Sequence, residues 1–207
     1  MLNKYSFIVL SSLFLTSFST QAEFSPNYFE AGLGATNLNL MEKVSSSGDS
    51  KPLASARVLI GGRLTSKNLW FETMYQYNGK FENNSTDIQG TLTEHQVTSY
   101  TSHNIAFGVK ATTNPYTKLS AFIKGGIGQN RTQLSESIRI TNSTNNSVSN
   151  SSSSQTKTTE LFYGGFGMTF NLYKNTNLTL DLLSTHYTLS ETELSDTTLF
   201  VSYNTFL

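Results

Sequence analysis

The segment Ser184-Thr185-His186-Tyr187-Thr188, followed by Glu191 and Glu193, contains side chains that could work together in catalysis. A histidine beside a hydroxyl can act as a general base, and a carboxylate can orient its imidazole, as in acyl-transfer hydrolases. Side chains alternate along a strand, so Ser184 and His186 would share one face with Leu182. The simpler interpretation, which we favour, is the polar end of a strand. The hydrolytic alternative has four candidate members: Ser184, His186, Thr188 and Glu191.

Other site chemistries find less support in the sequence. The chain has no cysteine, which excludes disulfides, thiolate catalysis and cysteine–zinc sites. His95 and His103 make no metal-ligand spacing with His186, so we expect no metal and no cofactor. Gly125-Gly126-Ile127-Gly128 and Gly164-Gly165-Phe166-Gly167 look like nucleotide loops, but strand periodicity continues through both and no helix follows. The 14 basic and 14 acidic residues balance, so no nucleic-acid partner is expected.

The composition and the first residues point to export. Charged residues make up only 14% of the 207-residue chain, against roughly 25% in ordinary soluble domains. Residues 1–22 are typical of a secretory signal peptide, because Lys4 precedes an apolar stretch and Thr20-Gln21-Ala22 offers small residues to a signal peptidase. We expect cleavage after Ala22 and a single mature domain, 23–207. No later segment reaches the roughly 20 apolar residues of a membrane helix, so any membrane crossing must use strands.

Eight segments of strand length follow the leader, and each alternates apolar with polar or small residues. They cover residues 28–40, 56–64, 69–77, 97–110, 118–129, 162–172, 177–187 and 197–207. Short polar turns (65–68, around 114–115, and 173–176) alternate with long connections at about 41–55, 79–96, 130–160 and 188–196. The run of Ser, Thr and Asn within 141–154 is expected to be a flexible surface loop, because it cannot bury enough apolar surface. The sequence predicts an all-β, eight-stranded antiparallel up-and-down transmembrane β-barrel, with tight turns at one end and extracellular loops at the other.

The charged residues indicate which face of the strands points inward. None lies on the central apolar face, and seven share the opposite face: Glu30, Arg57, Arg63, Glu72, Lys110, Lys124 and Asp181. Their opposite charges would nearly neutralise one another in a narrow lumen. Seven glycines on the same face suit the crowded interior of a small barrel: Gly32, Gly34, Gly61, Gly126, Gly128, Gly165 and Gly167. Aromatic residues near strand ends predict girdles at the membrane interfaces: Tyr75, Tyr77, Phe170, Tyr173, Tyr187 and Tyr203.

The predicted mature chain resembles the small eight-stranded outer-membrane proteins, namely the transmembrane domain of OmpA and the OmpX/Ail-like barrels. The most specific match is the end, Leu199-Phe200-Val201-Ser202-Tyr203-Asn204-Thr205-Phe206-Leu207, which looks like the signal read by the barrel-assembly machinery. Leu207 stands where this family usually has phenylalanine. The resemblance implies location in the cell outer membrane, with the assembly machinery, membrane lipid and lipopolysaccharide as partners. Adhesion, serum resistance, lipid A modification and structural roles all occur on such barrels.

We therefore predict a non-enzymatic surface barrel whose long loops contact a host or cell-surface ligand or the envelope, as in adhesion. One alternative is an outer-leaflet enzyme, because the segment around His186 resembles the His-x-Ser segment of lipid A 3-O-deacylases, with Thr188 at the serine position. Another alternative is a narrow, porin-like channel. Eight strands give a bore that side chains essentially fill, so a plugged cylinder is expected.

Overall fold

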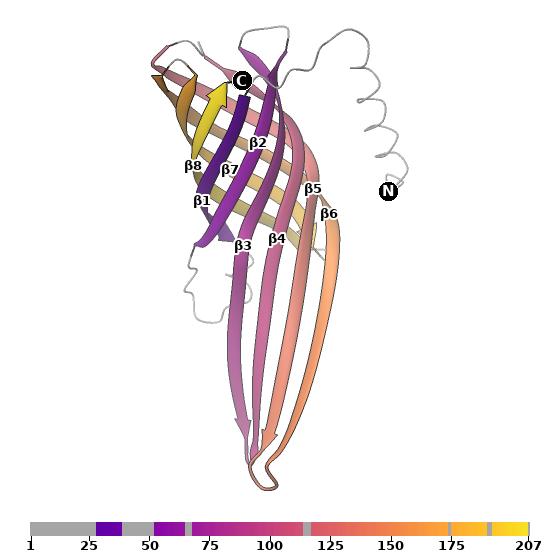
Figure 1. Cartoon of the computed structure of the whole chain (residues 1–207). Coiled ribbons are helices and arrows are strands. Elements are labelled where there is room, and N and C mark those ends of the chain that lie inside the picture. The colour runs from indigo at the N-terminus through magenta and orange to yellow at the C-terminus, as the bar shows by residue number, and fades with distance from the viewer. Residues whose placement is uncertain are drawn as a thin grey trace.

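In the computed structural model, eight strands close into an antiparallel up-and-down barrel in which β8 pairs with β1 (Figure 1). The structure describes residues 28–38, 52–64, 68–113, 117–173, 175–189 and 192–206. The strands are β1 (Tyr28–Leu38), β2 (Leu53–Arg63), β3 (Leu69–Gln89), β4 (Leu92–Thr112), β5 (Leu119–Asn142), β6 (Ser147–Tyr173), β7 (Thr176–Leu189) and β8 (Thr192–Phe206). The predicted fold class is confirmed. The predicted leader, most of the connection at 41–55, Glu191 and Leu207 lie outside the described residues.

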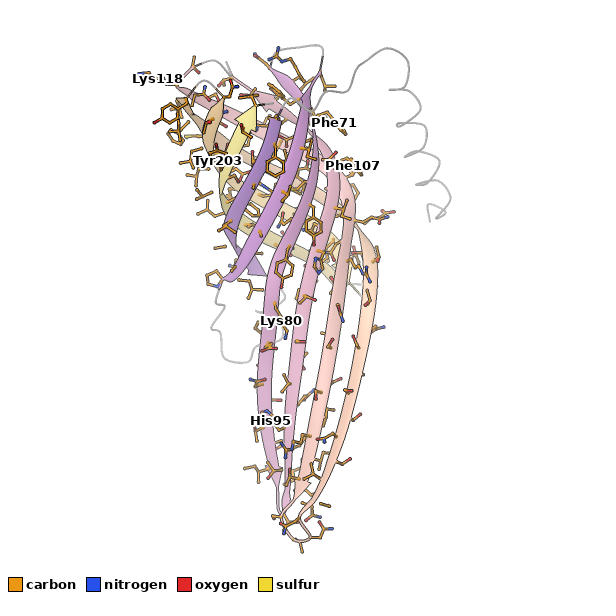
Figure 2. All side chains as sticks on the ribbon, in the orientation of Figure 1. Phe71, Lys80, His95, Phe107, Lys118 and Tyr203 are labelled. Atoms are coloured by element: carbon orange, nitrogen blue, oxygen red, sulfur yellow. The ribbon has the colours of Figure 1, made fainter. Side chains whose placement is uncertain are left out.

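Strand alternation gives the wall an apolar outside and a polar inside. On β4, Ile105, Phe107 and Val109 are exposed, whereas Ala106 between them and the flanking Asn104 and Lys110 are buried. Figure 2 shows Phe71, Phe107 and Tyr203 on the outside of the wall. The same pattern holds on the other strands, where the exposed apolar residues include Phe29, Val58, Ile60, Ile123, Ile127, Phe162, Phe166, Leu180 and Val201. Within the described residues, no helix is long and apolar enough to cross a bilayer.

Four of the strands continue far beyond the barrel as one open sheet (Figure 1). β3 pairs with β2 only up to Tyr77, and β6 pairs with β7 only from Leu161 onward. The pairing of β3 with β4, β4 with β5 and β5 with β6 continues to the two hairpin turns. We name residues 78–103 and 131–160 the extension. It leaves the barrel at the end opposite Phe206, the last described residue of β8 (Figure 1).

The extension corrects the prediction of loops at 79–96 and 130–160. Both regions are strands, joined by the turns Gly90-Thr91 and Ser143-Thr144-Asn145-Asn146. The prediction was wrong because it treated a lack of apolar residues as a lack of structure. Each added residue only continues a ladder that the barrel has already started, and threonine suits a strand whose two faces are open. The connection at 188–196 is likewise shorter than predicted, since β7 and β8 flank residues 190–191.

Local backbone geometry marks where the extension begins and where it ends. Gly79 has a φ of +80° at a register shift between Tyr77 and Lys80, where β3 leaves β2. Glycine adopts this conformation without strain, and such bulges turn a strand away from its partner. At the tip, Gly90 has a φ of +62°, as the first central position of a type II′ hairpin turn requires. In the second turn, the backbone N–H of Ser147 donates to Asn145 Oδ1 at 3.1 Å. These features order a segment that the sequence suggested would be flexible.

Candidate functional site: the filled lumen and the open extension

Arg57 is the centre of an ion cluster inside the barrel. Its Nη1 and Nη2 atoms lie 3.0 and 3.1 Å from the two carboxylate oxygens of Asp181, and Nη2 also ion-pairs with Glu30. Nη2 donates a further hydrogen bond to Ser202 Oγ at 3.0 Å. The guanidinium lies 4.2 Å from the centroid of the Phe200 ring. Such a bidentate pairing fixes the orientation of both side chains in the lumen.

Two lysines complete the charge balance of the lumen. Lys124 ion-pairs with Asp181, and Lys110 Nζ lies 3.5 Å from Glu72 Oε1. The Tyr28 hydroxyl donates a hydrogen bond to the same carboxylate oxygen of Glu72. Six of the seven predicted lumen charges are thus buried and brought together as three cations and three carboxylates: Arg57, Lys110, Lys124, Glu30, Glu72 and Asp181.

Arg63 is the exception among the predicted lumen charges. By the alternation of side chains along β2, Arg63 shares its face with the inward-pointing Arg57. It lies at the barrel end, however, where its side chain is exposed. Its guanidinium lies 5.3 Å from the centroid of the Trp70 ring. Arg63 therefore stands at the mouth of the barrel and is no part of the buried ion cluster. Side-chain alternation alone could not show how close Arg63 would be to the rim of the barrel.

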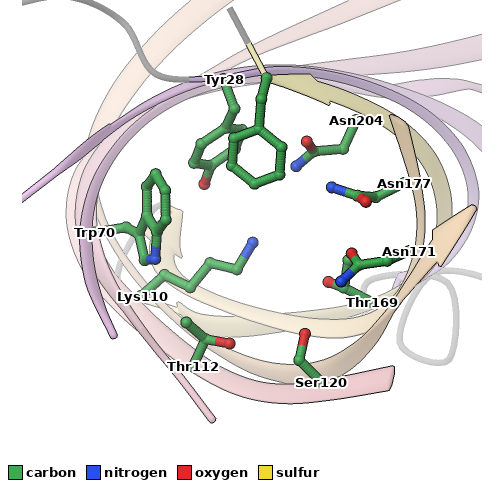
Figure 3. A pocket seen from close by; sticks show the side chains of 10 residues that line it. Tyr28, Trp70, Lys110, Thr112, Ser120, Thr169, Asn171, Asn177 and Asn204 are labelled. Atoms are coloured by element: carbon green, nitrogen blue, oxygen red, sulfur yellow. The ribbon is translucent and has the colours of Figure 1, made fainter. Parts of the chain in front are cut away.

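The lumen has little space left near this mouth. Tyr28 packs edge to face against Trp70 and Phe206, whose own rings are tilted relative to each other, and the three ring centroids are 5.3 to 6.1 Å apart. A cavity of about 30 Å³ remains beside them, lined partly by Lys110 and Asn204 and open to the mouth (Figure 3). Such a volume holds at most a few waters. Further along the lumen, an apolar cluster is buried: Met74, Ala106, Leu161, Tyr163, Leu183, Tyr187, Leu194 and Phe200. This packing gives no support to the channel alternative.

A second polar cluster lies in the lumen close to the extension, and the sequence analysis missed it. Tyr187 donates a hydrogen bond to Asp196 Oδ2 at 2.7 Å, and its hydroxyl is 2.9 Å from that of Tyr100. All three residues are buried, so Tyr187 belongs to the interior and the prediction that placed it in an aromatic girdle was wrong. The alternation of side chains along β7 could have placed Tyr187 inside, because it is an even number of residues from the inward-pointing Asp181. Asp196 was missed because the last strand was predicted to begin only at residue 197.

The candidate hydrolytic residues lie on the outside of β7. Ser184 Oγ is 3.3 Å from His186 Nε2, so the predicted neighbourhood of the imidazole and a hydroxyl is present. Thr188 is exposed and pairs in register with Glu193 on β8. Among the described residues, no carboxylate contacts His186, and no group of three or more His, Asp or Glu residues is placed to hold a metal ion. The hydroxyl next to the imidazole is that of Ser184, whereas the deacylase resemblance requires residue 188.

The extension is mostly polar in composition, and most of its residues are exposed. Beyond Tyr100 and Thr132, which are buried at its base, both of its faces are open, because no other described strand covers them (Figure 1). Within the part of the chain that the structure describes, its two outer strands also carry backbone N–H and C=O groups without a strand partner over much of 78–89 on β3 and 147–156 on β6. Such edges are available to pair with an added strand.

Comparisons with known proteins agree on the fold. The family model described as "Outer membrane protein beta-barrel domain" matches residues 6–205. The chain is similar to the crystal structure of Neisserial surface protein A, with 15% identity and a TM-score of 0.54 over 88% of this chain and 98% of that one. It is also similar to Ail, the attachment invasion locus protein of Yersinia pestis, in complex with the heparin analogue sucrose octasulfate, with 10% identity and a TM-score of 0.51 over 86% of this chain and 97% of that one. No curated protein matches the sequence significantly.

Proposed function

This chain belongs to the outer membrane protein β-barrel family, and we propose that it acts as a surface-binding protein whose binding element is the extension. In this proposal, a cleaved leader directs export and the C-terminal strand is read by the barrel-assembly machinery. The barrel anchors the molecule, and the extension projects from the outer membrane toward a host or neighbouring cell. Barrels of this type have short turns on the periplasmic side and long connections outside, which supports this orientation.

One observation carries the proposal: four strands continue beyond the membrane-spanning barrel as an ordered sheet with open faces and open edges. Barrel closure needs none of these residues, because β2 and β7 stop pairing with β3 and β6 near Tyr77 and Leu161. A rigid sheet loses less conformational entropy on binding than a flexible loop would. The name of the structurally similar Ail, attachment invasion locus protein, describes a role of the same kind for that protein.

Shortening the extension tests this function. Glu82, Ser99, Ser135 and Ser154 form one row across the four strands. We expect that replacing residues 83–98 and 136–153 each by Asn-Gly, a favoured hairpin turn, leaves a barrel that still migrates as a folded, heat-modifiable band. Binding of expressing cells to host cells or to one another should fall at least about tenfold, because most of the contact surface is gone.

A matched control keeps the length and changes only the tip, by exchanging Gly90-Thr91 for Asn-Gly. We expect this variant to bind like the parent protein, because the faces and edges remain. Full binding by the shortened, folded barrel would contradict the proposed function.

A further inference from the structure

A row of three asparagines lies beside the small cavity at the barrel mouth, at the end opposite the extension. Asn171 on β6 is directly opposite Asn177 on β7, which is directly opposite Asn204 on β8. All three line the cavity (Figure 3). Directly opposite residues of antiparallel strands have Cβ atoms only about 4.5–5.5 Å apart. The row therefore concentrates amide groups on one side of the cavity.

Two of these amides are buried and have polar atoms without a partner. Asn177 and Asn204 are only 2% and 3% exposed. Among the described residues, neither Asn177 Nδ2 nor Asn204 Oδ1 has a hydrogen-bond partner. A buried polar atom without a partner lowers stability, so such atoms often indicate a role other than packing. Both amides reach toward the cavity in Figure 3, so one donor and one acceptor are available to a ligand there.

An ammonium group and aromatic rings form the opposite side of the cavity. Lys110 reaches into this space in Figure 3, and its Nζ lies 3.5 Å from Glu72 Oε1. An ammonium has three donors, so Lys110 can donate to a further acceptor in the cavity. Trp70 and Phe206 also line the cavity, with ring centroids 5.8 Å apart. The cavity thus combines a positive charge, amide groups and an apolar wall.

The sequence around this mouth favours an anionic ligand. Arg63 and Lys118 are exposed at this end of the barrel. Each of the three tight turns of this end contains one lysine and no acidic residue in its sequence: Lys67 in 64–68, Lys118 in 113–118 and Lys174 in 174–175. Positive charge around an opening raises the local concentration of anions and speeds their entry. An anionic group is therefore the best candidate for the cavity.

We infer that the mouth binds the terminal carboxylate of an extended peptide. The cavity volume of about 30 Å³ has room for two or three water-sized groups at roughly 10–15 Å³ each, which is the size of one carboxylate. The carboxylate oxygens accept hydrogen bonds from Lys110 Nζ and Asn177 Nδ2, the first of them charge-assisted. The peptide N–H next to the carboxylate donates to Asn204 Oδ1. The rest of the peptide leaves through the open mouth, past Trp70 and Phe206.

The unpartnered acceptor favours a peptide terminus over a small free carboxylate. Acetate could accept from Lys110 and Asn177, but it has no N–H group for Asn204 Oδ1. A peptide terminus has both kinds of group on adjacent atoms, and it continues in the direction in which the cavity is open. With the extension outside the cell, as proposed above, this mouth faces the periplasm and the peptide is a periplasmic one.

The fluorescence of Trp70 tests this site, because the chain has one tryptophan and it lines the cavity. The full-length protein, refolded in detergent, is titrated with N-acetyl-alanyl-alanine, with the C-terminal amide of the same dipeptide, and with acetate. We expect a saturable change in Trp70 emission with the free dipeptide. The amide should bind at least about tenfold more weakly, because a charge-assisted contact is lost. Acetate should also bind more weakly, because it lacks the peptide N–H.

Asn177→Ala separates binding from folding. Since Asn177 Nδ2 has no partner within the described part of the chain, this variant should still show heat-modifiable migration. It should bind N-acetyl-alanyl-alanine about tenfold more weakly. Asn175→Ala is the matched control, because Asn175 is exposed two residues away and does not line the cavity, and it should bind like the parent protein. Lys110→Met should weaken binding at least as much, and Asn177→Ala decides the result if Lys110→Met does not fold.

A Trp70 signal that does not saturate, or equal binding of the free dipeptide and its amide, would overturn the inference and leave water as the occupant. Equal affinities of Asn177→Ala and Asn175→Ala would overturn it as well. Acetate that binds as tightly as the dipeptide would make this a site for small anions and contradict the peptide assignment. The proposed surface function can fail separately, since shortening the extension leaves this mouth unchanged.

Discussion

Replacing Arg57 by methionine is expected to destabilise the barrel by about 3–5 kcal/mol, the usual cost of removing one partner from a buried ion pair. The change preserves much of the side-chain volume but leaves three buried carboxylates facing two lysines. Glu30 loses its ion-pair partner, and Asp181 keeps only Lys124. The measurement is urea unfolding of the protein refolded into lipid vesicles. The chain has one tryptophan, Trp70, and it is buried at the barrel mouth, so its fluorescence reports directly on unfolding.

The charge balance can be restored to check the cause of this loss. Adding Glu30→Gln to Arg57→Met leaves two cations and two carboxylates in the lumen, and we expect the double variant to regain part of the lost stability. The exposed Arg139→Gln should stay within about 0.5 kcal/mol of the parent protein, as surface changes usually do. An Arg57→Met variant as stable as Arg139→Gln would show that the buried cluster does not contribute to the free energy of unfolding.

The second large effect is expected from one methyl group at Gly108. A Cβ there would lie 2.1 Å from the Tyr163 hydroxyl oxygen and 2.4 Å from the backbone oxygen of Gly125. The contact with Gly125 is with backbone, so no rotation of a side chain relieves it. Gly108→Ala should therefore cost about 1–3 kcal/mol or more through overpacking, or prevent barrel closure altogether.

Gly164 is the matched control, because a Cβ at this position meets nothing within 4 Å. Both glycines lie within strands, so the change in backbone entropy is comparable, and Gly164→Ala should be neutral or slightly stabilising. The measurement is the fraction of refolded protein that shows heat-modifiable migration, followed by urea unfolding. Equal behaviour of the two alanine variants would mean that the lumen is not tightly filled around Tyr163.

The wall of the barrel and most of its interior could be predicted from the sequence, because side-chain alternation fixes the face of each residue once one face is known. Arg57 and Asp181 are 124 residues apart in the chain and still meet, since each has inward parity on its own strand. Arg63 shares that parity but lies at the rim. Its position along the barrel axis depends on strand tilt, which alternation does not encode.

The extension could not be predicted in this way, because beyond its base, where Tyr100 and Thr132 are buried, its strands bury neither face. The serine run at 149–154 has the composition of a disordered loop, yet it pairs along its whole length with β5. What orders it is the preceding ladder in the barrel, a long-range effect that a local reading of composition cannot include. The Tyr187–Asp196 hydrogen bond was missed for a related reason, since β7 and β8 continue further than their apolar residues indicate.

The most direct measurement of the central claim, that the extension stands outside the cell above a lipid-embedded wall, is cysteine labelling on intact bacteria. The chain has no cysteine, so single substitutions can be read without background. With a large polyethylene glycol maleimide, Ser152→Cys on the extension should react on intact cells, and Lys118→Cys only after lysis. Ile123→Cys, on the apolar wall, should stay unreactive in both as long as the barrel is in the membrane. Reaction of Lys118→Cys but not Ser152→Cys on intact cells would contradict the account.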